Sequence, residues 1–221
     1  KEIGMLVKDF VTHTVDFYNH LEKQPFCHPA TSQTISRLEN QRIPTHSRPV
    51  QEVYTEMLRD IYSNAVSLQH PRSFSCIPST ASLLSWMGDV MTNAYNPHAS
   101  CKINAPAADL VERKLIRWMC DLVGYPKESG GLFLSGGSIS NLTALTSARD
   151  TKLTYTEREK AVIYVSDQTH SSVAKGLHII GFRKEQIHIV STDHLFRMDI
   201  CELQTAIQND LSHGQKPFAI V

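Results

Sequence analysis

One stretch of the chain decides the fold: Phe133-Leu134-Ser135-Gly136-Gly137-Ser138-Ile139-Ser140-Asn141, which leads into the helical run 142–149. An apolar segment ends in small residues, and these residues open a helix. Glycine lets the backbone approach a ligand closely because it has no Cβ. A helix start adds unpaired N–H groups and the positive end of the helix dipole. The turn 136–138 therefore predicts a site for a phosphate or carboxylate, and the alternative is an ordinary turn capped by Ser138.

A second stretch repeats this pattern further along the chain. The β-branched run 161–165 predicts a buried strand, and Ser166-Asp167-Gln168-Thr169-His170-Ser171-Ser172-Val173-Ala174-Lys175 follows it. Thr169 is the expected N-cap of the next helix. His170 then lies at the carboxyl end of the strand, where open α/β sheets bind ligands. A single histidine at a helix start is more often a cap or a surface residue, so both interpretations of His170 stay open.

Together the two stretches resemble one enzyme family, the group II pyridoxal-phosphate-dependent amino-acid decarboxylases, which include aromatic amino-acid and glutamate decarboxylases. That family carries a Ser-Gly-Gly-Ser turn, an Ala-Leu-x-x-Ala-Arg helix and a later Ser-x-Gln-x-His-Ser-Ser-Val segment. This chain has them at 135–138, 144–149 and 166–173. His70-Pro71-Arg72-Ser73-Phe74 and the segment 106–118 also fall in family order. The resemblance covers nearly all of the chain from about residue 48.

The resemblance implies a fold class and a division of the chain. The fold is α/β, the PLP-dependent transferase-like (fold type I) large domain with a mostly parallel sheet, preceded by an N-terminal helical segment. Residues 1–100 are expected to be that helical segment and to pack in a homodimer, and residues 101–221 to be the first part of the cofactor-binding domain.

Hydrophobic periodicity places the elements. Helical spacing is seen at 3–17 and again at 49–68, with a polar connection between them at 24–49. Short apolar strands then alternate with helices, which is typical of a parallel sheet covered on both faces. The expected elements are helix 106–123, a strand at Leu132, helix 139–150, strand 161–165, helix 170–180, strand 187–190, helix 199–210 and a last strand at 217–221 that resembles a central one.

Site residues follow from the resemblance, residue by residue. Gly137 and Ser138 match the residues that hold the phosphate of pyridoxal 5'-phosphate. His170 matches the residue that stacks on the pyridine ring and assists proton transfer, and Ser79 matches a hydroxyl residue that reaches toward the cofactor. The substrate pocket is expected to include His98, acting from a loop across the dimer, together with Cys76 and Pro78.

The lysine that carries the family's cofactor as a Schiff base has no match. It belongs to a His-Lys pair, which does not occur here, and the aspartate for the ring nitrogen is also unmatched. Lys175, about one turn past His170, does not correspond to it. The chain therefore resembles the N-terminal half of such an enzyme, and alone it is expected to be inactive. The alternative is a truncated, non-catalytic fragment that binds the cofactor or serves as a structural partner.

Composition excludes several other classes. The chain has 22 basic and 22 acidic side chains, so no overall charge favours nucleic acid or anionic lipid. Its five cysteines are widely spread, and with no signal peptide they indicate reduced thiols in the cytoplasm. No H-x-x-x-H pair suggests a metal site, and no apolar run is long enough to cross a membrane. A nucleotide-binding domain is disfavoured because both of its glycine motifs are missing.

The expected reaction is decarboxylation of an L-amino acid to its amine and CO₂. An aromatic substrate is favoured, tryptophan first, because Tyr95-Asn96-Pro97-His98 resembles tryptophan-decarboxylase-like members and no Arg or Lys occurs from 73 to 101. An acidic substrate would require a cation to pair with its side chain. Glutamate or another non-aromatic amino acid remains the alternative.

Overall fold

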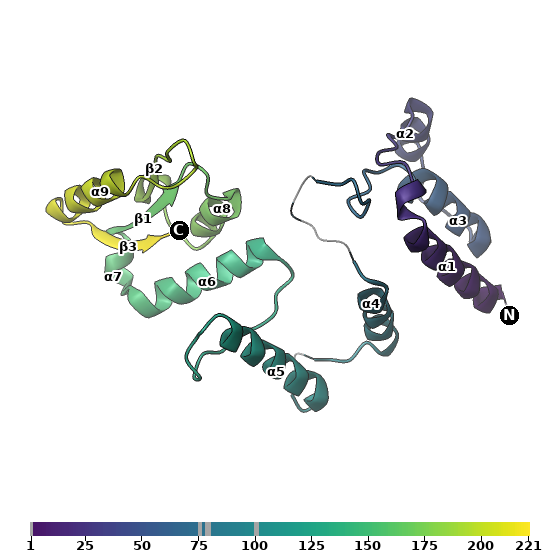
Figure 1. Ribbon diagram of the computed structural model, residues 1–221, viewed down its shortest axis with the longest axis horizontal. Helices are drawn as coiled ribbons and strands as arrows, with labels where there is room; N and C mark the ends of the chain where they lie inside the picture. The colour runs from purple at the N-terminus through teal and green to yellow at the C-terminus, as the bar shows by residue number, and fades with distance from the viewer. Residues whose placement is uncertain (1, 75–76, 78–80, 100–101) are drawn as a thin grey trace. The chain divides into compact units, whose positions relative to one another are not determined.

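The computed structural model describes residues 2–74, 77, 81–99 and 102–221. The chain divides into two compact units, Lys1–His98 and Ala99–Val221. Figure 1 shows helices alone along the first unit and helices with strands in the second. Each unit is described by itself.

The described part of the first unit is helical and contains no strand. Its elements are α1 (Glu2–Asn19), a 3₁₀ turn (Leu21–Lys23), α2 (Ser32–Glu39), α3 (Val50–Met57), a π-helical turn (Leu58–Tyr62) and α4 (Leu83–Tyr95). Phe10 of α1 lies 6.4 Å from the ring of Tyr54 and 5.9 Å from that of Trp86, measured between ring centroids. These aromatic contacts join α1, α3 and α4.

Two helix boundaries in this unit differ from the prediction. Helix α2 lies inside the segment 24–49 that was expected to be a connection, and Thr31 caps it by accepting a hydrogen bond from the backbone N–H of Thr34 at 3.2 Å. The apolar stripe of so short a helix is too sparse to stand out. The helix expected over 49–68 ends at Tyr62, where the backbone N–H and hydroxyl of Ser63 both donate to the Leu58 carbonyl.

One buried acid of this unit is paired with two arginines. The Asp60 carboxylate is almost fully buried and is paired with the guanidinium groups of Arg37 and Arg59. The hydrogen bond from Arg59, supported by Arg37, lowers the pKa of Asp60 to about 2. A buried carboxylate is tolerated only when it is paired and hydrogen-bonded in this way.

The second unit alternates helices and strands. Its elements are α5 (Pro106–Leu122), α6 (Gly137–Lys152), α7 (Tyr155–Arg158), β1 (Ala161–Ser166), α8 (Ser171–Ile179), a 3₁₀ turn (Lys184–Gln186), β2 (Ile187–Val190), α9 (Ile200–Ser212) and β3 (Lys216–Ile220). The three strands form a parallel sheet in the order β2-β1-β3, so the predicted parallel α/β architecture is confirmed.

Strand β1 carries the core because it is buried on both faces. Ile163 and Val165 point to one face and pack with Leu145 of α6 and Leu177 of α8. Val162 and Tyr164 point to the other face, where Leu203 and other residues of α9 cover them. Alternation of side chains along a strand produces this division. Figure 1 shows the sheet between α9 and the pair α6 and α8.

The last predicted strand, 217–221, is present as β3, which pairs in parallel with β1 and has an irregular register opposite Val162. Its expected central position stays a prediction. The strand prediction at Leu132 is wrong. Residues 132–134 pair with no other strand among the described residues. Instead the backbone N–H of Phe133 donates to a carboxylate oxygen of Glu112 on α5 at 3.2 Å.

Candidate functional site

The glycine turn forms the start of α6. Gly136 is the N-cap residue, with φ 153° and ψ 172°, a region that is essentially restricted to glycine. A Cβ built on Gly136 or Gly137 meets no heavy atom within 4 Å, so the space around the turn is open. The turn thus exposes backbone rather than side chain.

The hydrogen-bond donors of this turn are unused. No side chain caps α6, and the N–H groups of Gly137 and Ser138 donate to nothing in the described part of the chain. Ser138 lies in the first turn of the helix and does not cap it, so the alternative of a turn capped by Ser138 is wrong. No acidic residue lies in the first turn, and Arg149 and Lys152 lie in the last. The dipole and the free donors therefore favour an anion at this end.

The second helix start is closed by a histidine. His170 is the N-cap of α8, and its Nδ1 accepts a hydrogen bond from the backbone N–H of Ser172 at 3.2 Å. Thr169, the predicted cap, has another role. Its Oγ1 accepts from the Ser166 backbone N–H at 2.9 Å and donates to the Val221 carbonyl at 3.2 Å. The Thr169 hydroxyl therefore bonds to residues at the strand ends and does not cap α8.

Both neighbouring strands support the segment that carries His170. Asp167 donates its backbone N–H to the Val190 carbonyl of β2 at 3.2 Å, and Thr192 donates its hydroxyl to the Asp167 carboxylate at 2.9 Å. The contact from Thr169 to Val221 fixes the other side, next to β3. Because parallel strands end at one edge, these contacts hold His170 at the carboxyl edge of the sheet.

Helices α6 and α8 pack side by side in the same direction. Gly176 of α8 is buried, and a Cβ built there would lie 3.6 Å from the Leu142 Cα of α6. One turn earlier, Asn141 contacts Ser172, and near the helix ends Arg149 donates to the Ile180 carbonyl. Contacts therefore run from start to start and from end to end. This packing brings the glycine turn and His170 to the same end of the helix pair.

A hydrogen-bond chain joins the two helix starts. The Asn141 side-chain Nδ2 donates to the Ser172 Oγ at 2.8 Å, and this oxygen lies 2.8 Å from the His170 Nδ1. Ser172 is buried, whereas His170 is exposed. Sequence reasoning missed the roles of Asn141 and Ser172, because the contact spans 31 positions and depends on how the helices pack.

The other predicted site residues lie elsewhere in the chain. Ser79, Cys76 and Pro78 lie outside the described residues. His98 is exposed in the segment after α4, whose C-cap residue, Asn96, has a left-handed conformation. His98 belongs to the first unit, whereas Gly137, Ser138 and His170 belong to the second. The structure therefore brings Gly137, Ser138 and His170 together. The cofactor role of Ser79 and the substrate roles of Cys76, Pro78 and His98 stay predictions.

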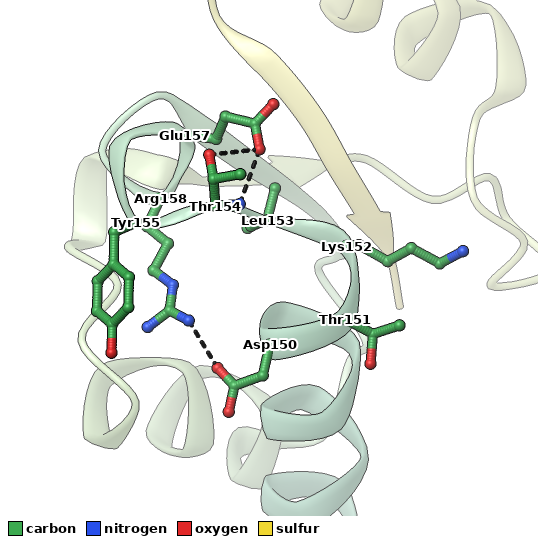
Figure 2. Close-up of a pocket in the computed structure, with 8 residues that line it drawn as sticks. All are labelled: Asp150, Thr151, Lys152, Leu153, Thr154, Tyr155, Glu157 and Arg158. Carbon is green, nitrogen blue, oxygen red and sulfur yellow. Dashed lines mark hydrogen bonds and ion pairs between the residues drawn. The ribbon is translucent and has the colours of Figure 1, made fainter.

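One cavity of the described chain is not part of this site. It has a volume of about 340 Å³ and lies at the turn between α6 and α7 (Figure 2). Its acidic groups already have partners: Asp150 accepts from Arg158 at 2.8 Å, and Glu157 accepts from the Thr154 backbone N–H at 2.8 Å and pairs with Lys216. Because α6 has 16 residues, its two ends are about 24 Å apart. The cavity lies at the end opposite the glycine turn.

A buried polar network lies on the other face of the sheet, toward α9. The Tyr164 hydroxyl donates to the Asp210 carboxylate at 2.7 Å, and His188 Nδ1 lies 3.1 Å from the same oxygen. Burial, together with the Asp210 carboxylate, raises the pKa of Tyr164. This network fixes α9 on the sheet and lies on the face away from α6 and α8.

Neither a metal-binding cluster nor a membrane-spanning helix is found among the residues that the structure describes. No group of three or more His, Cys, Asp or Glu side chains in that part of the chain is arranged to hold a metal ion. None of its helices is both long and apolar enough to cross a membrane. Cys27, Cys120 and Cys201 are free thiols.

Comparison with known proteins identifies the family. The profile described as the pyridoxal-dependent decarboxylase conserved domain matches residues 32–221. The chain belongs to this family. Aromatic-L-amino-acid decarboxylase of Bacillus atrophaeus is 30% identical over 221 residues, which are 100% of this chain and 45% of that protein. Tyrosine decarboxylase 2 of Narcissus pseudonarcissus is 28% identical over 95% of this chain and 44% of its own length.

Solved structures agree on the fold. Oryza sativa TDC with PLP and tryptamine superposes with a TM-score of 0.87 at 23% identity, over 99% of this chain and 48% of that one. The predicted PLP-dependent transferase-like fold is therefore confirmed. The chain spans a little under half of the curated relatives that it matches.

The glycine turn fits the phosphate of pyridoxal phosphate, the cofactor of this decarboxylase family. It presents two backbone N–H donors and one hydroxyl that have no partner among the described residues, open space for an anion, and no acidic residue in the first turn of α6. When bound, this cofactor withdraws electrons from the Cα of an amino acid. Of the residues of this chain, Gly137 and Ser138 would hold the phosphate, and His170 would present one face of its imidazole.

Proposed function

We propose that this chain provides the phosphate- and ring-binding part of a pyridoxal-phosphate-dependent amino-acid decarboxylase. The observation that carries the proposal is the convergence of an uncapped, donor-rich helix start at Gly137 and Ser138 with His170 at the carboxyl edge of a parallel sheet. Family membership supports the cofactor, and the free donors support the place where its phosphate binds.

In the proposed site each residue has one task. The Gly137 and Ser138 N–H groups and the Ser138 hydroxyl donate to phosphate oxygens, and the α6 dipole adds to this attraction. His170 covers the ring and, through its exposed nitrogen, serves a proton transfer. The lysine that would hold the cofactor covalently has no counterpart among these 221 residues. We therefore propose that residues 1–221 alone position the cofactor and do not decarboxylate.

The proposed substrate is an aromatic L-amino acid, converted into its amine and CO₂. Two relatives support this class, since one is named for aromatic amino acids and the other for tyrosine. Within the class we place tryptophan first, on the resemblance around Tyr95 and His98. The segment 73–101 carries no Arg or Lys to pair with an acidic substrate. We also propose that the enzyme acts as a homodimer in the cytoplasm, with His98 serving the partner's site.

Replacing Ser138 with Ala in the complete natural polypeptide tests the phosphate site. Loss of one hydroxyl donor to a charged ligand removes roughly 1.5–3 kcal/mol, so affinity for pyridoxal phosphate should fall about tenfold or more. Equilibrium binding of the cofactor measures this fall, and the free energy of unfolding should not change because the Ser138 hydroxyl has no partner in the described chain.

Ser147→Ala is the matched control, because Ser147 is also exposed on α6 and lies nine positions further along. It should bind the cofactor as the natural protein does. Equal affinity of the Ser138 and Ser147 variants would remove the phosphate role of the turn.

CO₂ release from a panel of amino acids tests the substrate class in the same preparation, and turnover of glutamate with aromatic amino acids ignored would contradict it.

A further inference from the structure

His170 receives two hydrogen-bonding groups on a single nitrogen. The backbone N–H of Ser172 donates to His170 Nδ1 at 3.2 Å, and the Ser172 Oγ lies 2.8 Å from the same atom. The Asn141 Nδ2 donates to that Oγ at 2.8 Å. The other ring nitrogen, Nε2, has no partner among the described residues.

The direction of each hydrogen bond follows from whether its groups can donate or accept. A backbone N–H can only donate, so Nδ1 must offer its lone pair to Ser172. Because Nδ1 then carries no proton, the Ser172 hydroxyl can only donate to it, and the Ser172 oxygen keeps lone pairs for the Asn141 amide. A neutral imidazole with a lone pair on Nδ1 carries its proton on Nε2.

We propose that Asn141 and Ser172 are positioning residues that hold neutral His170 in the Nε2–H tautomer and fix its ring. His170 then presents a hydrogen-bond donor, and not an acceptor, to a ligand in the site. This inference rests on the proposed function, since it concerns the state in which His170 meets the cofactor and substrate.

Burial strengthens the hydrogen bonds that orient His170. Ser172 is 5% exposed, so water competes little for its hydroxyl, and Asn141 is half-buried beside it. Asn141 belongs to the helix that begins with the glycine turn, and its contact with Ser172 crosses the α6–α8 interface. The tautomer of His170 therefore depends on the position of α6, the proposed phosphate-binding helix.

NMR of the complete polypeptide with isotope-labelled histidine tests this directly. The ¹⁵N resonances of the ring distinguish the two neutral tautomers and the doubly protonated form, and the cofactor-free protein is measured at a pH where His170 is neutral. The natural protein should show the Nε2–H form. In Ser172→Ala the ratio of the Nε2–H to the Nδ1–H tautomer should fall about fivefold, the change that loss of a typical hydrogen bond produces.

Asn141→Asp reverses the direction of the hydrogen bonds from Asn141 through Ser172 to His170, with almost no change in side-chain shape. A carboxylate only accepts, so it takes the Ser172 hydroxyl proton and turns an oxygen lone pair toward Nδ1. The tautomer ratio should fall about tenfold or more, because the new hydrogen bond involves a charged group. A role limited to packing would leave the ratio unchanged in this variant.

Ser171→Ala is the control, since Ser171 is the exposed neighbour whose hydroxyl has no partner in the described chain. It should keep the natural ratio. Finding the Nδ1–H form in the natural protein overturns the proposal, and so does an unchanged ratio in folded Ser172→Ala and Asn141→Asp. Because the cofactor is absent from this measurement, failure of the proposed function would show only in the binding assay on Ser138→Ala, so the two failures are distinguishable.

Discussion

The starts of α6 and α8 have similar sequences, but only the start of α8 is capped by a side chain. Each follows an apolar segment and a few small or polar residues. At α6 the cap is Gly136, no side chain reaches back, and the first donors are free. At α8 the cap is His170, whose ring nitrogen takes the Ser172 N–H. One helix start is therefore available to an anion, whereas the other is satisfied internally.

The difference shows how two neighbouring helix starts can serve one ligand. Free donors attract charge, whereas a capped start holds a side chain in a fixed direction. Because α6 and α8 pack side by side in the same direction, the anion site and the oriented imidazole lie at the same end of the helix pair. Three substitutions test this arrangement, at the shared packing and then at each start.

Gly176→Leu should have the largest effect, because it separates the two helices. The Cβ of residue 176 lies 3.6 Å from the Leu142 Cα, which is ordinary contact, but the further atoms of leucine have no space there. Overpacking at a buried site should lower the free energy of unfolding by about 3 kcal/mol. Denaturant unfolding measures the loss. Gly176→Ala is the matched control and should fold with equal or higher stability, because alanine favours a helix.

Gly136→Ala should have the next largest effect, at the α6 start alone. The φ of 153° is strained for any residue with a Cβ, and this strain should lower the free energy of unfolding by about 2 kcal/mol. No atom lies within 4 Å of the added Cβ, so the loss would come from the backbone and not from a clash. Gly137→Ala, where φ is not positive, should show no loss. Equal stability of the two variants would argue against a glycine-only turn.

Local pattern predicted much of this structure. The runs 161–165 and 187–190 are strands, and the helices after Pro106, Gly136, His170 and Asp199 begin within a few residues of their expected positions. These elements were predictable because apolar periodicity and helix-start residues are properties of neighbouring positions. The Gly-Gly turn was predictable for the same reason, since its chemistry lies within four residues.

Errors arose where a distant partner decides the outcome. Residues 132–134 have an apolar, strand-like sequence, but strand pairing depends on a neighbour, and the Phe133 N–H is bound by Glu112 instead. Thr169 has the right side chain for a cap, yet it bonds to Val221, 52 positions away. The Asn141–Ser172 contact likewise depends on helix packing. Such pairings cannot be read from spacing along the chain.

The smallest effect, at the α8 start, separates the two roles of His170. His170→Ala removes the cap acceptor for the Ser172 N–H, which should lower the free energy of unfolding by about 1 kcal/mol. His170→Asn restores a side-chain acceptor, because asparagine is among the best N-cap residues, and should recover most of this loss. Hydrogen exchange at the Ser172 amide should be faster in the alanine variant and near the natural rate in the asparagine variant. Neither variant retains a ring to cover the cofactor, so both should bind pyridoxal phosphate more weakly than the natural protein. If the asparagine variant were as unstable as the alanine variant, His170 would not stabilise α8 by capping, and the contrast between the two helix starts would lose its physical basis.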